Sequence, residues 1–260
     1  MLIAGLARKH AAVSDIRAFL AFYASYLVKD LHKPEMKRLL RTVRPYSMVS
    51  YERLRRLYEL AESAEVNRLE GAFVECGVWR GGCSGVMAYL ANKYGSGREV
   101  HLFDSFEGLP DPTDRDGEEA RSYMDRLRHG AYAGKFGCAV SADTVKSFLS
   151  DRLKISCEHV HIHQGWFKHT IPRQAAGIGD IALLHADADW YDSTKVCLDH
   201  LYDKVVPGGA VVFDDYGYWP GCKRAVDEFF AERRLATRLQ RIDACGYYVI
   251  KPSASEDRSR

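Results

Sequence analysis

Two apolar runs of this sequence each end in a pair of aspartates. Asp187 and Asp189 close the run that begins at residue 181, and Asp214 and Asp215 close the run that begins at residue 209. The two runs and the helix-length segment between them, in which Pro207 and Gly208 fall, predict a βαβ unit with buried parallel strands. Neighbouring parallel strands end about 4.8 Å apart at one edge of a sheet. Four carboxylates crowded there would repel one another, so the spacing predicts a hard divalent cation with oxygen ligands.

Acids and histidines also occupy such positions for purely structural reasons. An acid after a strand can cap the next helix, and this interpretation stays open for any single one of the four aspartates. Two doublets at facing strand ends disfavour this interpretation for all four aspartates together. A separate set, His159, His161 and His163, shares one face of a strand-like segment. No fourth ligand is evident near these histidines, which disfavours zinc.

A glycine-containing loop, residues 75–84, follows a predicted strand at 72–76. It occupies the place of the ligand-binding turn in a doubly wound sheet, and its glycines let the backbone approach a ligand closely. Its spacing differs from the G-x-G-x-x-G dinucleotide signature, which disfavours NAD. Tight packing of the strand on the following helix would also account for these glycines.

Asp104 ends the next predicted strand, residues 99–104. An acid there can accept hydrogen bonds from both hydroxyls of a ribose, and Ser105 and Phe106 follow as candidates for the adenine site. Glu75 and Asp104 together would repel a diphosphate but attract a positively charged ligand. The two acids therefore favour S-adenosylmethionine, whose amino group and sulfonium are positive.

The elements that position these residues follow an α/β pattern. Residues 1–70 read as an N-terminal helical cap, and residues 71–251 as a ligand-binding domain built on a doubly wound, mostly parallel, Rossmann-like sheet. Within that domain, residues 107–137 form a polar insertion, either a substrate lid or a surface loop with a short helix around 123–127. Residues 237–242 and 246–250 predict a C-terminal antiparallel hairpin. Residues 252–260 predict a disordered tail.

Six segments between residues 44 and 248 together resemble the macrocin O-methyltransferase family. These segments are long, ordered and specific. They are Arg44-Pro45-Tyr46-Ser47-Met48, Phe73-Val74-Glu75-Cys76-Gly77-Val78-Trp79-Arg80-Gly81-Gly82, Asp104-Ser105-Phe106-Glu107-Gly108-Leu109-Pro110, Gly165-Trp166-Phe167, Asp187-Ala188-Asp189-Trp190-Tyr191-Asp192-Ser193-Thr194 and Asp214-Asp215-Tyr216-Gly217.

The resemblance implies a class I methyltransferase that uses S-adenosylmethionine and Mg²⁺ to methylate sugar hydroxyls of macrolide, aminocoumarin and related natural products. It implies metal ligands at Asp187, Asp214 and Asp215, with Asp189 as the general base. Ala188 stands where the family commonly has glycine, which is tolerable unless the backbone there has positive φ. His185 also departs from the family pattern, and a buried strand histidine is more often structural than chemical.

The resemblance and the loop together place the cofactor among residues from several strand ends. Trp79, Tyr46, Met48, Trp166 and Phe167 are placed there by the resemblance, although aromatic residues are also buried for packing alone. Ser141, at another expected strand end, is a candidate for the adenine site. The full predicted set is Tyr46, Ser47, Met48, Glu75, Gly77, Trp79, Gly81, Ser84, Asp104, Ser105, Phe106, Ser141, Gly165, Trp166, Phe167 and Asp187.

Composition limits the partners. The 37 basic and 35 acidic residues nearly cancel, so charge offers no argument for a nucleic acid. Seven cysteines without a C-x-x-C pair favour a reduced, cytoplasmic setting, and no apolar run reaches transmembrane length or forms a targeting segment. The expected partner is a small glycoside or sugar. Apolar stripes in the N-terminal helices predict a homo-oligomer, although they could equally pack on their own sheet.

Three rival functions are compatible with parts of this pattern. The acid cluster requires only a diol, so a catechol-like acceptor would serve as well as a sugar. A biosynthetic scaffold that binds the cofactor without chemistry is disfavoured by the complete set of acids. A nicotinamide oxidoreductase is weakened by the absent dinucleotide signature.

Overall fold

The protein is built on one seven-stranded sheet. The structure, a computed structural model, describes residues 17, 19–129, 139–235 and 238–252. The strand order is β3-β2-β1-β4-β5-β7-β6, with β1 to β5 parallel and β7 antiparallel to both of its neighbours. This confirms the predicted doubly wound, mostly parallel sheet. The strands are β1 Ala72–Cys76, β2 Val100–Asp104, β3 Val160–Gln164, β4 Ile181–Ala186, β5 Val205–Phe213, β6 Gln240–Arg241 and β7 Tyr247–Ile250.

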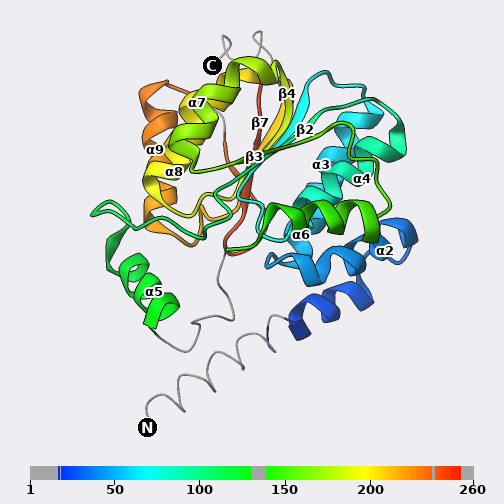
Figure 1. Ribbon diagram of the computed structural model, residues 1–260, viewed down its shortest axis with the longest axis horizontal. Helices are drawn as coiled ribbons and strands as arrows, with labels where there is room; N and C mark the ends of the chain where they lie inside the picture. The colour runs from blue at the N-terminus through cyan, green and yellow to red at the C-terminus, as the bar shows by residue number, and fades with distance from the viewer. Residues whose placement is uncertain (1–16, 18, 130–138, 236–237, 253–260) are drawn as a thin grey trace, which may run out of the picture.

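Helices cover both faces of the sheet. Figure 1 shows α2, α3 and α4 gathered on one side and α7, α8 and α9 on the other. The helices are α2 Pro34–Val43, α3 Tyr51–Val66, α4 Gly82–Tyr94, α5 Gly117–His129, α6 Ala142–Ser147, α7 Phe167–Ile178, α8 Tyr191–Leu201 and α9 Pro220–Glu232, with 3₁₀ turns η1 Arg44–Tyr46 and η3 Tyr202–Lys204 and the π-helical turn η2 Phe148–Arg152.

The core lies in two layers because alternate side chains of a strand point to opposite faces. Phe73 of β1 packs in the cluster under α2, α3 and α4, whereas Val74 packs in the cluster under α7, α8 and α9. All five residues of β1 and of β2 are buried, as expected for central parallel strands. The carboxyl ends of these strands are therefore fixed relative to one another by the packing of both layers.

The N-terminal helices form part of the covering layer. Helices α2 and α3 pack on α4, and their buried residues share one apolar cluster with the sheet. Ser50 caps α3 by accepting a hydrogen bond from the Arg53 backbone N–H at 3.1 Å. This cap fixes the start of α3 beside the carboxyl edge of the sheet, where Arg53 reaches the site.

Three local expectations needed correction. Pro207 and Gly208 lie inside β5, in a register shift opposite Ile181 and Leu183, and not in the segment between the strands. The backbone of this bulge is hydrogen-bonded to the residue after β7, since the Gly208 N–H donates to the Lys251 carbonyl at 2.8 Å. The hairpin forms as predicted but β6 is only two residues long, and the short helix expected around 123–127 extends over all of α5.

Some expectations fall outside the described residues. These are residues 1–16 and 18 of the predicted cap, residues 130–137 of the predicted insertion, residue 237 of the predicted hairpin and residues 253–260 of the predicted tail. Helix α5, the described helix of the insertion, lies to one side of the sheet in Figure 1, and its buried residues Ala120 and Met124 pack in the cluster under α7, α8 and α9. In the part of the chain that the structure describes, no helix combines the length and apolar character needed to span a membrane.

Candidate active site

Four aspartates meet at the carboxyl edge of β4 and β5. Asp187 and Asp189 follow β4, and Asp214 and Asp215 follow β5, which pairs with β4 in parallel. Carboxylate oxygens of Asp187, Asp214 and Asp215 all lie within 4.8 Å of one another. Parallel strands thus bring the two doublets together, as their spacing in the sequence predicted.

The acids differ in how their charge is balanced. Desolvation raises the pKa of Asp187 and of Asp189 well above the usual range, and repulsion from neighbouring aspartates adds to it. Desolvation and Asp214 raise the pKa of Asp215 to about 6. Desolvation also acts on Asp214, but Arg53 and His185 outweigh it and lower the pKa of that carboxyl.

The donor set fits a hard divalent cation. The three clustered carboxylates offer only oxygen ligands, which Mg²⁺ prefers. Asp214 Oδ1 is buried and has no hydrogen-bond partner among the described residues, and His185 Nε2 stands 3.7 Å from it. A buried carboxylate oxygen without a donor costs free energy unless a cation or another donor satisfies it.

Arg53 brings a positive charge to this cluster from the N-terminal helices. Its guanidinium hydrogen-bonds Asp214 Oδ2, and its Nε donates to Asp243 Oδ2 at 3.1 Å. Asp243 also accepts a hydrogen bond from Ser50 Oγ at 2.6 Å. Arg53 therefore connects α3, the end of β5 and the turn between β6 and β7.

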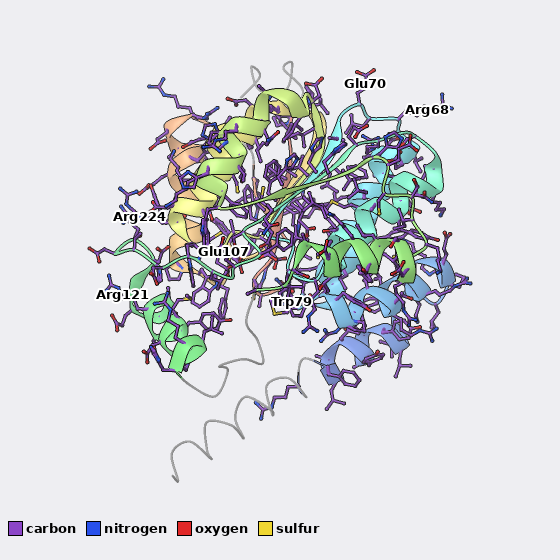
Figure 2. The ribbon with its side chains drawn as sticks, in the orientation of Figure 1. Arg68, Glu70, Trp79, Glu107, Arg121 and Arg224 are labelled. Carbon is purple, nitrogen blue, oxygen red and sulfur yellow. The ribbon has the colours of Figure 1, made fainter. Side chains whose placement is uncertain are left out.

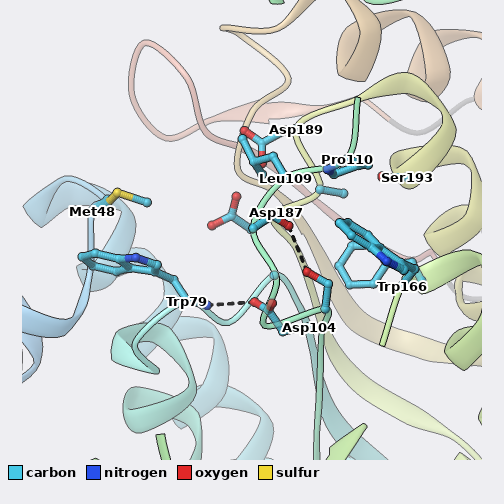
Figure 3. Close-up of a pocket in the computed structure, with 14 residues that line it drawn as sticks. Met48, Trp79, Asp104, Leu109, Pro110, Trp166, Asp187, Asp189 and Ser193 are labelled. Carbon is cyan, nitrogen blue, oxygen red and sulfur yellow. Dashed lines mark hydrogen bonds between the residues drawn. The ribbon is translucent and has the colours of Figure 1, made fainter. Parts of the chain in front are cut away.

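Two adjoining cavities open at this edge of the sheet. The first lies among the ends of β1, β2 and β4, and Figure 3 shows Trp79, Asp104 and Trp166 around it. The second lies beside it and contains the metal-ligand candidates together with Arg53 of α3 and Trp219. Asp187 and Asp189 line both cavities, so a molecule in either one reaches these two acids.

The loop after β1 approaches its neighbours more closely than most side chains would allow. Gly77 has φ +93°, and a Cβ there would stand 1.9 Å from the Asp187 carbonyl oxygen. A Cβ on Gly82 would stand 2.4 Å from Ser47 Cβ. Figure 2 shows Trp79 of this loop at the opposite end of the sheet from Arg68 and Glu70, which precede β1. The glycines thus permit the contacts that close the cavities.

Asp104 anchors this loop through backbone donors. Its Oδ2 accepts hydrogen bonds from the N–H groups of Val78 at 2.7 Å and Trp79 at 3.0 Å, and its Oδ1 accepts from Phe106 N–H at 2.7 Å. A carboxylate offers about four acceptor positions. Three are used inside the protein, so the predicted contact with a ribose would share this carboxylate with the loop.

The family assignment follows from comparison with known proteins. The model of the macrocin O-methyltransferase (TylF) family matches residues 29–251. The chain belongs to this family.

Two O-methyltransferases from Streptomyces species are similar to this chain over most of their length. The demethyldecarbamoylnovobiocin O-methyltransferase of Streptomyces niveus is 36% identical over 204 residues, which cover 78% of this chain and 74% of that enzyme. An 8-demethyl-8-(2,3-dimethoxy-alpha-L-rhamnosyl)-tetracenomycin-C 4'-O-methyltransferase of Streptomyces olivaceus is 31% identical over 211 residues, covering 81% and 77%.

A solved structure agrees with the assignment. The O-methyltransferase NovP superposes with a TM-score of 0.70 at 35% identity, covering 80% of this chain and 83% of that one. The chain is accordingly an S-adenosylmethionine-dependent O-methyltransferase with a class I fold. This confirms the family and the enzyme class that the sequence motifs predicted.

In this macrocin O-methyltransferase family member, most predicted cofactor residues line a cavity. Met48, Gly77, Trp79, Asp104, Ser105, Trp166, Phe167 and Asp187 line the first, and Tyr46, Ser47 and Glu75 line the second.

Five predicted cofactor residues, Gly81, Ser84, Phe106, Ser141 and Gly165, line neither of the two described cavities. Ser84 is fully buried and donates to Glu75. The strand end predicted at Ser141 was wrong, because Ser141 instead caps α6 by accepting a hydrogen bond from Thr144 N–H. Gly165 N–H donates to the Asp104 carbonyl and Phe106 N–H to the Asp104 carboxylate, and Gly81 precedes the first turn of α4 with φ +87°. These residues shape the loops, and their contact with the cofactor stays a prediction.

Several lining residues escaped prediction from the sequence. Arg53, Tyr123, Tyr218 and Trp219 line the second cavity. They come from α3, from α5 and from the segment before α9, and nothing in their local pattern distinguishes them from residues on ordinary helix faces. The first cavity is also lined by Leu109 and Pro110. These two residues belong to one of the six segments that resemble the family, so the sequence could have predicted them.

A buried polar network joins the loop after β1 to the metal-ligand candidates. Glu75 and His185 are partners on the adjacent strands β1 and β4, with Nδ1 and Oε1 3.2 Å apart. Burial lowers the pKa of His185, but Asp214 and Glu75 outweigh it and raise that pKa to about 9. The two acids therefore favour the protonated form of His185. It lines neither cavity, which favours the structural interpretation of this residue.

We expect His185→Phe to lower the free energy of unfolding by about 3 kcal/mol, because it leaves the buried Glu75 carboxyl without its histidine partner, and only the Ser84 hydroxyl still donates to it. His185 and Glu75 side chains are 2% and 1% exposed. His161→Phe is the matched control, since His161 pairs with Glu99 where the side chains are 44% and 43% exposed. An exposed pair contributes at most about 1 kcal/mol. Urea unfolding measures both variants, and equal losses would contradict the structural importance of the network.

Proposed function

We propose that this enzyme transfers the methyl group of S-adenosylmethionine to a sugar hydroxyl of a glycosylated natural product, with Mg²⁺ as the metal. The observation that carries this proposal is the arrangement of Asp187, Asp214 and Asp215 beside Asp189, at the junction of two cavities. The name of the tetracenomycin relative includes a rhamnosyl group, which supports a sugar acceptor.

We assign the cofactor to the first cavity. Asp104 stands at the end of β2, and Trp166 lies across the cavity from Trp79 and Met48 in Figure 3. Phe167 also lines this cavity. S-adenosylmethionine supplies an electrophilic methyl group on a positively charged sulfur. The carboxylates of Asp104 and Asp187 give this cavity a negative potential that attracts such a cation.

We assign the metal and the acceptor to the second cavity. Asp187, Asp214 and Asp215 would hold Mg²⁺, which supplies Lewis-acid polarisation of an acceptor hydroxyl. Asp189 accepts the proton of that hydroxyl while the hydroxyl oxygen bonds to the methyl carbon of the cofactor. The bond between this carbon and the cofactor sulfur breaks, and its electron pair stays on the sulfur. The walls of the two cavities orient the oxygen, the methyl carbon and the sulfur in line, and such positioning can lower the barrier by several kcal/mol.

A catechol-like acceptor is the second candidate. Tyr123, Tyr218 and Trp219 line the second cavity, and these aromatic rings would pack against a catechol as readily as against a sugar ring. The sugar is preferred because of the rhamnosyl group in the relative's name.

A mass-spectrometric assay distinguishes these candidates. The enzyme, S-adenosylmethionine and Mg²⁺ are incubated with glycosides that carry vicinal sugar hydroxyls and, separately, with catechols. We expect one added methyl group on a sugar of at least one glycoside. Methylation of catechols alone would show that the acceptor is catechol-like and not a sugar. Absence of turnover with every acceptor would favour the scaffold function.

The cytoplasmic setting and the homo-oligomer belong to the same proposal. All six described cysteines are free, which supports a reducing compartment. An apolar surface in the N-terminal segment supports self-association. It consists of five residues that are each more than half exposed, namely Phe19, Leu20, Leu27, Val28 and Leu31. Light scattering after size-exclusion chromatography should give the mass of a dimer or larger assembly, and a mass equal to the chain would contradict it.

A further inference from the structure

Asp189 is held by a hydrogen bond from a tryptophan that follows the other acid doublet. Trp219 Nε1 donates to Asp189 Oδ1 at 3.0 Å. Trp219 immediately precedes α9, and its backbone N–H donates to the Asp215 carbonyl at 3.0 Å. The loop that carries the metal-ligand candidates Asp214 and Asp215 thus also places the donor that meets Asp189.

The indole is fixed by packing on several sides. Trp219 is 5% exposed. Its ring packs edge-on against Trp190 at 4.8 Å, Tyr218 at 4.6 Å and Tyr123 of α5 at 5.3 Å between ring centroids. A ring enclosed in this way cannot rotate to follow a moving partner, so its N–H points in one direction.

The carboxylate of Asp189 requires such a fixed partner. Its backbone has φ +53°, in the left-handed region, and its N–H donates to Asp215 Oδ2 at 3.2 Å. These features fix the backbone but not the rotation of the carboxyl group about its own bonds. The indole N–H binds one carboxylate oxygen and leaves the other for the acceptor hydroxyl.

We propose that Trp219 is a positioning residue that orients Asp189 for proton transfer. This inference rests on the proposed function, in which Asp189 is the general base. Loss of the indole N–H allows the carboxylate to turn, which affects the rate of turnover and not the binding of S-adenosylmethionine. The indole itself exchanges no proton with the acceptor.

The kinetic test compares Trp219→Phe in two backgrounds. With Asp189 present, we expect kcat to fall about 10- to 100-fold, as is usual when an outer partner of a site residue is lost, with an unchanged Kd for S-adenosylmethionine. In Asp189→Asn, Trp219→Phe should change the residual rate by less than about twofold, because the group that it orients is already inactive. Equal losses in both backgrounds would overturn the proposal.

Trp190→Phe is the matched control. Trp190 has the same side chain, packs on Trp219 and is 2% exposed, but its Nε1 donates to the Pro110 carbonyl at 2.9 Å and not to an acid. Any loss of kcat that Trp190→Phe causes should be the same with aspartate or asparagine at position 189. If Trp190→Phe also lowered kcat only when Asp189 is present, the packing of the rings, and not the N–H of Trp219, would be what orients Asp189.

A second measurement requires no turnover. The protein contains four tryptophans, so ¹⁵N-labelled protein gives four indole N–H signals, and Trp219→Phe identifies the signal of Trp219. Asp189→Ala should move this signal upfield because the hydrogen bond is lost. An unmoved signal overturns the positioning role even if the enzyme is active. If the wild-type enzyme methylates no acceptor, the proposed function fails, while a moved signal still shows the hydrogen bond from Trp219 to Asp189.

Discussion

Asp189→Asn is expected to lower kcat about 10²- to 10⁴-fold, the usual contribution of a positioned general base. Asparagine preserves the size of the side chain and can still accept the hydrogen bond from Trp219 Nε1, but it cannot take the proton of the acceptor hydroxyl. The Kd for S-adenosylmethionine, measured by calorimetry, should not change. The loss should therefore appear in the rate of turnover at saturating cofactor.

Asp227→Asn provides the control for this variant. Asp227 lies on α9, bonds Tyr216 and Lys223 at the surface, and lines neither cavity of the site. The same chemical change there should leave turnover as in the wild type. Full activity of Asp189→Asn would remove Asp189 from the role of base.

The second large effect concerns the metal. Chelation of divalent cations should abolish turnover, and added Mg²⁺ should restore it. Asp214→Asn should weaken binding of Mg²⁺ at least about 10-fold, because it removes one of three anionic ligands and the negative charge that balances the Arg53 guanidinium beside the site. Calorimetric titration with Mg²⁺ alone measures this affinity independently of activity.

The control again is Asp227→Asn, which should bind Mg²⁺ as the wild-type enzyme does. Turnover that survives chelation would show that the carboxylate cluster serves another purpose than metal binding. Unchanged Mg²⁺ affinity in Asp214→Asn would remove this residue from the ligand set while leaving the role of Asp189 unaffected.

Local patterns were enough to predict much of this fold. The ends of β1, β2, β4 and β5 are encoded by short buried runs, each closed by a polar residue or a glycine, and these patterns depend only on neighbours in the chain. The boundaries of β5 were predicted less well. Pro207 and Gly208 normally interrupt a strand, but the chain after β7 supplies the hydrogen bonds that keep the bulge in the sheet.

Ala188 illustrates a condition that only the backbone could settle. An alanine in place of glycine between the two acids is tolerable if φ is negative there. The structure has its positive φ one residue later, at Asp189. Aspartate tolerates the left-handed region better than most residues, so the doublet keeps its geometry without a glycine.

The sequence by itself determined the family, the α/β fold and the meeting of two acid doublets at one edge, because parallel pairing converts positions along the chain into positions at a sheet edge. Only the tertiary structure decided how each acid is held. Arg53 reaches Asp214 across 161 positions, and Trp219 reaches Asp189 across 30. These contacts depend on the packing of α3 and on the loop before α9. No local pattern of residues records such packing, because it arises only when distant elements meet.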